Sequence, residues 1–382
     1  MYTRELKKEI QKWLEEDNVI IVYGARQVGK TTLVKEIATE LDSNPLYIDC
    51  EEVLTQDILN TRNLQDYKTL IQDYKVVIFD EAQKVKHIGA SLKLMHDHIK
   101  GVKLIATGSS SFELANKLSE PLTGRNYTYT LYPLSLKELS QKENMFALSS
   151  SLSTILRYGT YPKVFGSGDQ KAQKDLKVLA NDYIYRDTFE IEGGIRKPVL
   201  YKALVRQLAT LVGQETTLQE LSQKLNADRE TIERYLDILE KSFIVKILRP
   251  LQKNKAREIM YPFKIYFYDL GVRNGVLNEF REIVLRDSRE VGALWENFCV
   301  MERIKKNEYA GISKNYYFWR TKDQPIKEYD LVEEKDGHYE VYEMKWSQKK
   351  ESQVKKYPIF FETYPKSKLS VIHNQNWWQY LV

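Results

Sequence analysis

The chain has 382 residues, of which 42% are hydrophobic and 12% aromatic, so it is too long for one ordinary domain and has enough apolar residues for several cores. The net charge of +5 mildly favours an anionic partner such as nucleic acid, while Cys50 and Cys299 are too few and too far apart for a disulfide framework. The stretch MYTRELKKEIQKWLEED is too charged for a signal peptide, and no run approaches the roughly 18 apolar residues of a membrane span. We therefore expect a soluble cytoplasmic protein with no membrane partner.

The segment VIIVYGARQVGKTTLVKEIATEL contains the first strong pattern of the chain. An apolar strand is predicted at 19–23, then a loop that fits G-x-x-x-x-G-K-[ST], then a helix with an apolar stripe. This order predicts a P-loop, whose backbone N–H groups and helix N-terminus would surround the phosphates of ATP. Nine positions are assigned to nucleotide binding: Gly24, Ala25, Arg26, Gln27, Val28, Gly29, Lys30, Thr31 and Thr32.

The chemistry of this loop points to ATP hydrolysis. Lys30 would reach the terminal phosphates and act as a catalytic residue, and the Thr31 hydroxyl would ligate Mg²⁺. A second buried strand at 76–79 ends in Asp80-Glu81. We predict that Asp80 holds Mg²⁺ and that Glu81 is the general base that takes a proton from the attacking water. A polar strand end without a catalytic role is the alternative.

A third strand is predicted at 103–107, in VKLIATGSSS, and it ends in small polar residues. In ATPases with an extra strand between the two motifs, a polar residue at this place senses the γ-phosphate. Ser109 or Ser110 would fill that role, and an ordinary Gly-Ser turn is the alternative.

The motifs GARQVGKTTL, IFDEAQ, ATGSSS and LTGRNYTYTLYPLSLKEL resemble those of a large family of prokaryotic AAA-type ATPases with a C-terminal domain of unknown function. Three later segments resemble the same family in the expected order: YGTYPKVF, KIYFYDLGVRN and GALWENFCVMERIK. The resemblance covers nearly the whole chain. It implies an ATPase core, a helical and winged-helix middle, and an end domain similar to restriction-endonuclease folds.

Arg125, in LTGRNY, matches an arginine that recurs in this family after the sensor strand. Presented to the γ-phosphate of a neighbouring subunit, such an arginine would stabilise the charge of the transition state, so Arg125 is a candidate catalytic residue. The alternative is an arginine that pairs with a surface carboxylate.

The middle of the chain predicts a helix-turn-helix followed by a wing. Helices are expected at 217–225 and 229–242, with Asp228 as an N-cap between them, and a strand is expected at 243–251. The outward residues of the second helix are Arg229, Arg234, Lys241, Glu230, Glu233, Asp237 and Glu240. Four acids against three bases make a poor surface for a phosphate backbone, so a packing or ATPase-coupled element is favoured over DNA readout.

The C-terminal part predicts a helix at 292–306, a strand at 316–320, and then a hairpin about Asp336-Gly337. Opposite partners in this hairpin have residue numbers that sum to 673, so Asp330 would face Glu343 and Glu328 would face Lys345. Like charges directly opposite one another, with Cβ atoms roughly 5 Å apart, are destabilising.

This order of elements resembles the core of PD-(D/E)xK nucleases. Asp330 matches the aspartate of that motif, Glu343 and Lys345 match E-x-K, and Glu296 matches a helical glutamate that some branches add. Asp330 and Glu343 would together bind Mg²⁺ or Mn²⁺, and Lys345 on the same strand face would act on the attacking water. The alternative is a Glu328–Lys345 ion pair with solvated Asp330 and Glu343.

These patterns predict an α/β chain of four parts: a P-loop AAA-type ATPase domain at 1–148, a helical lid at 149–197, a winged helix at 198–284 and a nuclease-like α/β domain at 285–382. The expected cofactors are ATP and Mg²⁺, with a second Mg²⁺ or Mn²⁺ at Asp330 and Glu343. DNA, a protein partner and further copies of this chain remain open as partners. The main hypothesis is an ATPase acting on or near DNA with a metal-dependent nuclease domain. The alternatives are a nucleotide-dependent switch or scaffold that cuts nothing, and a transcription regulator.

Overall fold

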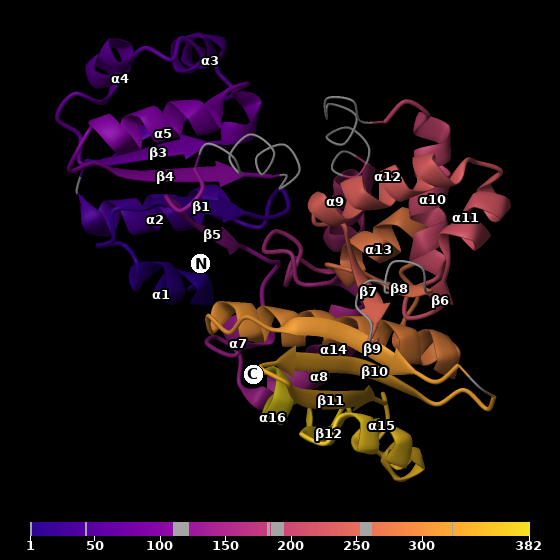
Figure 1. Cartoon of the computed structure of the whole chain (residues 1–382). Helices are drawn as coiled ribbons and strands as arrows, with labels where there is room; N and C mark the ends of the chain where they lie inside the picture. Colours follow the sequence, from indigo (N-terminus) through magenta and orange to yellow (C-terminus); the bar gives the residue numbers. More distant parts are fainter. Residues whose placement is uncertain are drawn as a thin grey trace. The chain divides into compact units, whose positions relative to one another are not determined.

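The computed structural model describes residues 2–42, 44–109, 122–181, 184, 195–252, 262–322 and 324–382. The chain forms two compact units. The first consists mainly of Thr3–Pro133, and the second of Leu134–Glu240 and Ile244–Val382. The class is α/β, with a parallel sheet in the first unit and a mixed sheet in the second (Figure 1).

The first unit contains a five-stranded parallel sheet with the order β2-β3-β4-β1-β5. Its strands are β1 (Val19–Tyr23), β2 (Leu46–Asp49), β3 (Val76–Asp80), β4 (Lys103–Gly108) and β5 (Asn126–Thr130). The three strands expected from the sequence are confirmed, and β4 lies between β3 and β1 as expected. Every residue of β1 and β3 is buried, because both faces of a parallel sheet are covered.

Helices cover this sheet. They are α1 (Glu5–Gln11), α2 (Lys30–Leu41), α3 (Val53–Asn60), α4 (Leu64–Ile71), the short 3₁₀ turn η1 (Ala82–Lys84) and α5 (Ile88–His98). Helix α2 packs on β1, β3 and β4, and α5 contacts α3 and α4 (Figure 1). Because the strands run in parallel, the chain segments that follow β1, β3 and β4 leave the sheet at the same edge.

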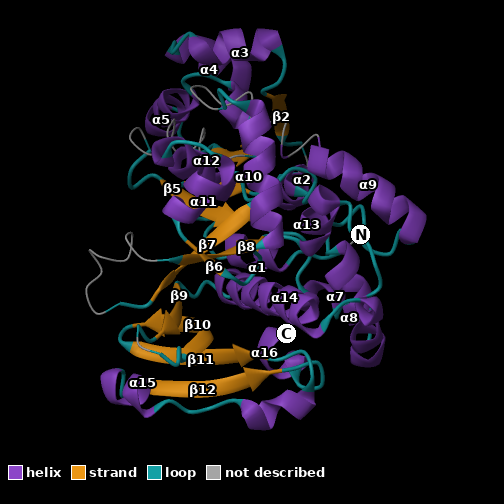
Figure 2. Ribbon diagram, turned by 90° about the vertical axis from the view of Figure 1, so that its right-hand side faces the viewer, coloured by secondary structure: helices purple, strands orange, loops and turns teal. Residues whose placement is uncertain are grey.

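The second unit contains a seven-stranded mixed sheet with the order β12-β11-β10-β9-β7-β8-β6. The strands are β6 (Glu215–Thr216), β7 (Val245–Pro250), β8 (Phe263–Phe267), β9 (Asn315–Arg320), β10 (Glu328–Lys335), β11 (His338–Met344) and β12 (Ser367–Ile372). Figure 2 shows β9 to β12 side by side. A parallel pairing of β7 with β9 makes the sheet continuous from the middle of the chain to its C-terminal part.

The helices of the second unit are α7 (Leu136–Leu139), α8 (Met145–Tyr158), α9 (Asp169–Asn181), α10 (Pro198–Thr210), α11 (Leu218–Leu225), α12 (Arg229–Lys241), α13 (Leu270–Leu277), η4 (Ile283–Leu285), α14 (Ser288–Tyr309), η5 (Gln348–Gln353), α15 (Pro358–Thr363) and α16 (Trp377–Leu381). The helices predicted as α11, α12 and α14 are confirmed. Asp228 accepts the backbone N–H of Thr231 at 2.7 Å, as expected of an N-cap.

The C-terminal hairpin has the predicted register. Leu331 lies opposite Tyr342, and Val332 lies opposite Val341. Its turn residues Asp336 and Gly337 have φ angles of 52° and 73°, which a two-residue turn of the type I′ class requires. The alternation of the side chains therefore places Asp330 and Glu343 as the sequence predicted, at the end of the hairpin remote from the turn.

Candidate nucleotide and carboxylate sites

The P-loop joins β1 to α2, and its first glycine has no room for a side chain. Gly24 has a φ of 149°, and a Cβ atom built there would lie 2.2 Å from the carbonyl oxygen of Leu131. Lys30 is 5% exposed, and its Nζ donates to the carbonyl oxygens of Gly24 at 2.9 Å and Ala25 at 3.1 Å. The ammonium group therefore lies inside the loop, where the terminal phosphates of a nucleotide would be bound.

Asp80 links the loop to the sheet. Its Oδ2 accepts hydrogen bonds from the hydroxyls of Thr31 at 2.7 Å and Tyr47 at 2.6 Å, and its Oδ1 accepts one from Thr107. Burial by itself would raise the pKa of Asp80, but the three hydroxyls and the charge of Lys30 outweigh burial and lower this pKa below its usual value. The ionised Asp80 carboxylate and the Thr31 hydroxyl are oxygen ligands of the kind that Mg²⁺ takes together with waters and phosphate oxygens.

Glu81 is held in a fixed position beside Asp80. It has a positive φ of 51°, and its backbone N–H donates to Thr107 Oγ1 at 3.1 Å. The side-chain amide of Gln83 donates both to Glu81 and to Ser109 Oγ, the latter at 2.9 Å. The predicted base and one predicted sensor residue are therefore joined through Gln83, whereas Ser110 lies outside the described residues.

Several contributors to this site were not identified from the sequence. Tyr47 comes from β2, and no local pattern marks it, because its position next to Asp80 depends on strand order. Thr107 and Gln83 stand within or beside the expected motifs. Arg4 supports the loop from the N-terminus, since its guanidinium donates to the carbonyl oxygens of Val28 and Tyr132, both at 2.6 Å.

Arg125 is engaged within its own chain. Its Nε donates to Asp97 Oδ1 at 3.0 Å, and its side chain is 39% exposed. This contact is the surface ion pair that the sequence left open as the alternative. A pair this exposed contributes about 1 kcal/mol or less to stability.

The carboxylate site of the second unit brings together three of the residues expected there. Asp330 Oδ2 accepts the backbone N–H of Met344 at 2.7 Å. Lys345 Nζ donates to Glu343 Oε1 at 2.6 Å and lies 3.8 Å from Asp330 Oδ2. Burial, followed by the charge of Asp330, raises the pKa of Glu343 to about 8.

The fourth expected residue, Glu296, is held by side chains from β8. Its Oε1 accepts hydrogen bonds from Lys264 Nζ at 3.0 Å and from the Tyr266 hydroxyl at 2.7 Å. Burial raises the pKa of Glu296 to about 7, although the charge of Lys264 opposes this shift. Sequence reasoning missed Lys264 and Tyr266, which lie within KIYFYDLGVRN but on a strand far from Glu296 in sequence.

Lys264 also corrects one detail of the predicted hairpin. Lys264 is 2% exposed and pairs with Glu328, so Glu328 is not the partner of Lys345. On the other side of β10, Glu328 lies opposite Arg320 of β9, and the register of this strand pair shifts between Tyr329 and Val332. The Glu328–Lys345 ion pair that was the alternative to a metal site is therefore absent.

The carboxylates do not form a ready-made metal centre. Among the residues that the structure describes, no group of three or more His, Cys, Asp or Glu side chains is arranged to hold a metal ion. Lys264 occupies one oxygen of Glu296 and one of Glu328, and Lys345 occupies one oxygen of Glu343. The other oxygen of Glu343, Oε2, is buried and has no hydrogen-bond partner among the described residues.

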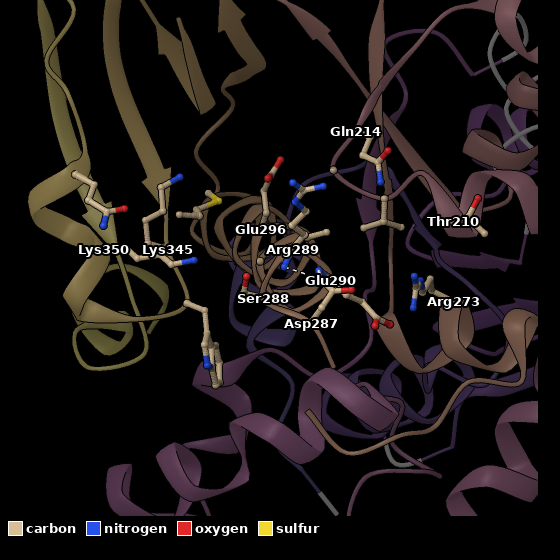
Figure 3. Close-up of a pocket in the computed structure, with 17 residues that line it drawn as sticks. Thr210, Gln214, Arg273, Asp287, Ser288, Arg289, Glu290, Glu296, Lys345 and Lys350 are labelled. Atoms are coloured by element: carbon tan, nitrogen blue, oxygen red, sulfur yellow. Dashed lines mark hydrogen bonds between the residues drawn. The ribbon is translucent and has the colours of Figure 1, made fainter. Parts of the chain in front are cut away.

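A cavity of about 840 Å³ opens beside this site (Figure 3). It is lined by Glu296, Met344 and Lys345 of the carboxylate site, by the first turns of α14, by the loop after α10 and by Arg273 of α13. This volume lies within the range of about 300–1,000 Å³ that is typical of ligand sites.

Family models match three segments of the chain. The model described as an AAA domain matches residues 16–140. Two models described as domains of unknown function, DUF8612 and DUF4143, match residues 149–282 and 291–379. The AAA match, the parallel sheet and the loop contacts together define an AAA-type P-loop ATPase domain in the N-terminal part of the chain.

Relatives of this chain occur in both bacteria and an archaeon. An uncharacterized protein of Mycobacterium tuberculosis is 26% identical over 351 residues, which cover 90% of this chain and 73% of the relative. An uncharacterized protein of Haemophilus influenzae is 24% identical, over 80% of this chain and 79% of the relative. An uncharacterized protein of Methanocaldococcus jannaschii is 25% identical, over 80% of this chain and 72% of the relative. Their names assign no activity.

Solved structures similar to this chain include RuvB and DnaA. RuvB of Thermotoga maritima, a Holliday junction branch migration motor, is 18% identical with a TM-score of 0.33, covering 68% of this chain and 95% of RuvB. AMPPCP-bound DnaA of Aquifex aeolicus is 13% identical with a TM-score of 0.29, covering 62% of this chain and 86% of DnaA. Similarity at this level assigns neither substrate nor partner.

Within the described part of the chain, no helix is both long and apolar enough to span a bilayer.

Substitution of Gly24 by alanine tests the close approach in the P-loop. The added Cβ would meet the Leu131 carbonyl oxygen at 2.2 Å, so we expect Gly24→Ala to lower the free energy of unfolding by about 2 kcal/mol or more and to weaken ATP binding. Gly101→Ala is the matched control, because Gly101 also has a positive φ, of 77°, but has open space around it. Chemical denaturation and binding of a fluorescent ATP analogue measure both effects. Equal losses in the two variants would contradict a steric origin of the effect.

Proposed function

We propose that this protein binds and hydrolyses ATP at the edge of the parallel sheet where β1, β3 and β4 end. The observation that carries this proposal is the 2.7 Å hydrogen bond between Thr31 and Asp80, which joins the loop to a carboxylate 49 residues away in the sequence. Lys30 and the loop N–H groups would hold the terminal phosphates, and Thr31 and Asp80 would hold Mg²⁺, which neutralises phosphate charge. Glu81 would take the proton of the attacking water. Gln83 and Ser109 would position the side chain of Glu81.

We further propose that the second unit is the part on which ATP turnover acts. The order α10-β6-α11-α12-β7-β8, with β8 between β6 and β7, is the order expected of a winged helix in the segment 198–284. Strand β7 continues the sheet into β9, and β8 supplies Lys264 to the carboxylate site. These contacts support a role for this segment in coupling to the proposed nuclease-like part at 285–382, rather than in reading DNA bases.

The proposed activity of the carboxylate site is metal-dependent cleavage of a phosphodiester in DNA. The buried Oε2 of Glu343, which has no partner among the described residues, supports this proposal, because a bound cation would supply the partner that this oxygen lacks and would favour ionisation of a carboxyl whose pKa is raised to about 8. Asp330, Glu343 and Glu296 would hold Mg²⁺ or Mn²⁺, which supplies charge stabilisation, and Lys345 would orient the attacking water.

A second candidate is a nucleotide-dependent switch whose carboxylate site binds a partner and cuts nothing. The contacts of Lys264 with Glu296 and of Lys345 with Glu343 favour this candidate, because a bound cation would have to compete with both ammonium groups.

Two variants test the ATPase proposal. Lys30→Ala should abolish tight ATP binding, because the phosphates lose the cation of the loop. Glu81→Gln should retain ATP binding and lower turnover about a hundredfold, since an amide cannot accept the proton of water. Binding of a fluorescent ATP analogue and release of phosphate are measured for each variant. The control is Glu52→Gln, an exposed acid of the same unit, and wild-type turnover in Glu81→Gln would show that Glu81 is not the base.

Mixed assemblies test whether Arg125 acts on the nucleotide of a second copy. Specific ATPase activity should rise with protein concentration, and mixing Arg125→Ala with Lys30→Ala subunits should restore part of it, because each variant supplies what the other lacks. Asp97→Asn is the control, since it removes only the ion pair within the chain. If Asp97→Asn lowers activity as much as Arg125→Ala does, and mixing restores nothing, Arg125 has only a structural role.

Metal addition to the full chain distinguishes the two candidates for the second unit. An isolated fragment of residues 285–382 would lack the β7–β9 pairing and Lys264, so the full chain is used. In a Lys30→Ala background, Mn²⁺ at a hundredfold excess over its Kd should stabilise the protein by about 2.7 kcal/mol. Asp330→Asn should abolish this response and the cleavage of labelled DNA, whereas Asp336→Asn, in the exposed turn, should change neither. Stabilisation without cleavage supports the switch, and a melting temperature that no metal alters excludes the metal site.

A further inference from the structure

The cavity beside the carboxylate site has a wall of mixed charge, but its acids and its bases differ in how they are engaged. Each acidic side chain of this wall accepts hydrogen bonds or forms an ion pair within the chain. Asp287 accepts the backbone N–H groups of Arg289 and Glu290 as the N-cap of α14. Glu290 pairs with Arg286 and Arg281, and Glu296 pairs with Lys264.

Three bases on the same wall have no such partner. Within the part of the chain that the structure describes, Arg273, Arg289 and Lys350 have no carboxylate within 4.0 Å. Arg289 and Lys350 are exposed, but Arg273 is only 6% exposed. In Figure 3, Arg289 and Glu296 on α14 lie between Lys345 on one side of the cavity and Arg273 on the other.

Arg273 is the informative residue among these three. Its Nε donates to the carbonyl oxygen of Ala209 at 2.8 Å, and its Nη1 donates to Asn274 Oδ1 at 2.9 Å. These neutral acceptors fix the plane of the guanidinium but leave its charge without a carboxylate in direct contact. Burial and the nearby charge of Arg286 lower the pKa of Arg273 to about 10, which the charges of Glu290 and Glu279 oppose. A buried cation with no carboxylate in direct contact is costly unless an anion binds beside it.

We propose that this cavity is a phosphate-binding subsite for a nucleic-acid strand, in which Arg273 and Arg289 hold successive phosphates and thereby place a phosphodiester beside Lys345 and Glu343. The inference rests on the proposed function of the carboxylate site and specifies what positions the substrate there. Arginine suits this role because its planar fork binds two phosphate oxygens at once. Lys350 adds charge at the rim of the cavity.

Binding in the absence of catalysis tests the subsite. Fluorescence anisotropy of a labelled single-stranded DNA, in EDTA and without ATP, reports binding to the full chain even if the metal site or the ATPase is wrongly assigned. Arg273→Gln and Arg289→Gln should each weaken binding about tenfold, and each should lower the slope of log K against log salt by about 0.7. Arg206→Gln is the control, because Arg206 is exposed on α10 and does not line the cavity.

The outcomes distinguish a strand subsite from a general anion site and from diffuse binding to surface charge. Arg289 is exposed, so its variant stays informative if Arg273→Gln lowers the melting temperature. Binding that responds equally to Arg206→Gln and Arg289→Gln overturns the subsite, as does the absence of any binding at low salt. If inorganic phosphate alone displaces the strand at equal phosphate concentration, or a polyglutamate peptide of equal charge does so, the cavity is a general anion site and the assignment to a strand is wrong. Strand binding without cleavage keeps the subsite and removes only the nuclease step.

Discussion

The buried ammonium group of Lys264 is the charge around which the second unit is organised. It is 2% exposed and is bonded to Glu296 of α14 and Glu328 of β10. Removing one partner of a buried ion pair costs about 3–5 kcal/mol, because the remaining charge is left without compensation. Lys264 comes from β8 in the middle of the chain, whereas its partners come from the C-terminal part. Together with the pairing of β7 and β9, this side chain connects the two parts of the seven-stranded sheet.

The same side chain sets the electrostatics of the carboxylate site. Four carboxylates gather there around two ammonium groups, so full ionisation leaves two negative charges: Glu296, Glu328, Asp330 and Glu343 against Lys264 and Lys345. The chain compensates this excess in part by raising the pKa of Glu296 to about 7 and that of Glu343 to about 8. A divalent cation carries the charge that would balance the site, and the unpaired bases of the neighbouring cavity would then face the substrate.

In the nucleotide site, the surroundings lower the pKa of the central carboxylate instead of raising it. Asp80 is also buried, but three hydroxyl donors and Lys30 surround it and lower its pKa. Its charge is therefore stabilised by the protein before any ion binds, which is the condition for a preorganised metal ligand. In the second unit, by contrast, lysines occupy the carboxylates. Because of this difference, the P-loop supports an ATPase directly, while the carboxylate site by itself does not distinguish the proposed nuclease from the proposed switch.

The sequence by itself determined the local elements whose patterns are contained in short segments. The strand, loop and helix around Gly24 and Lys30 were predicted because the P-loop depends on neighbouring residues, and the register of the hairpin followed from the Asp336-Gly337 turn and the alternation of side chains. Tertiary structure alone decided which distant side chains meet. Tyr47 reaches Asp80 because β2 lies next to β3, and Lys264 replaces Lys345 as the partner of Glu328 although β7 and β9 lie between β8 and β10 in the sheet. Arg273 likewise lines the cavity because of tertiary packing, and not because of its neighbours in the sequence. No periodicity marks these contacts, because strand order and helix packing are set by the burial of the whole sheet and not by any one segment.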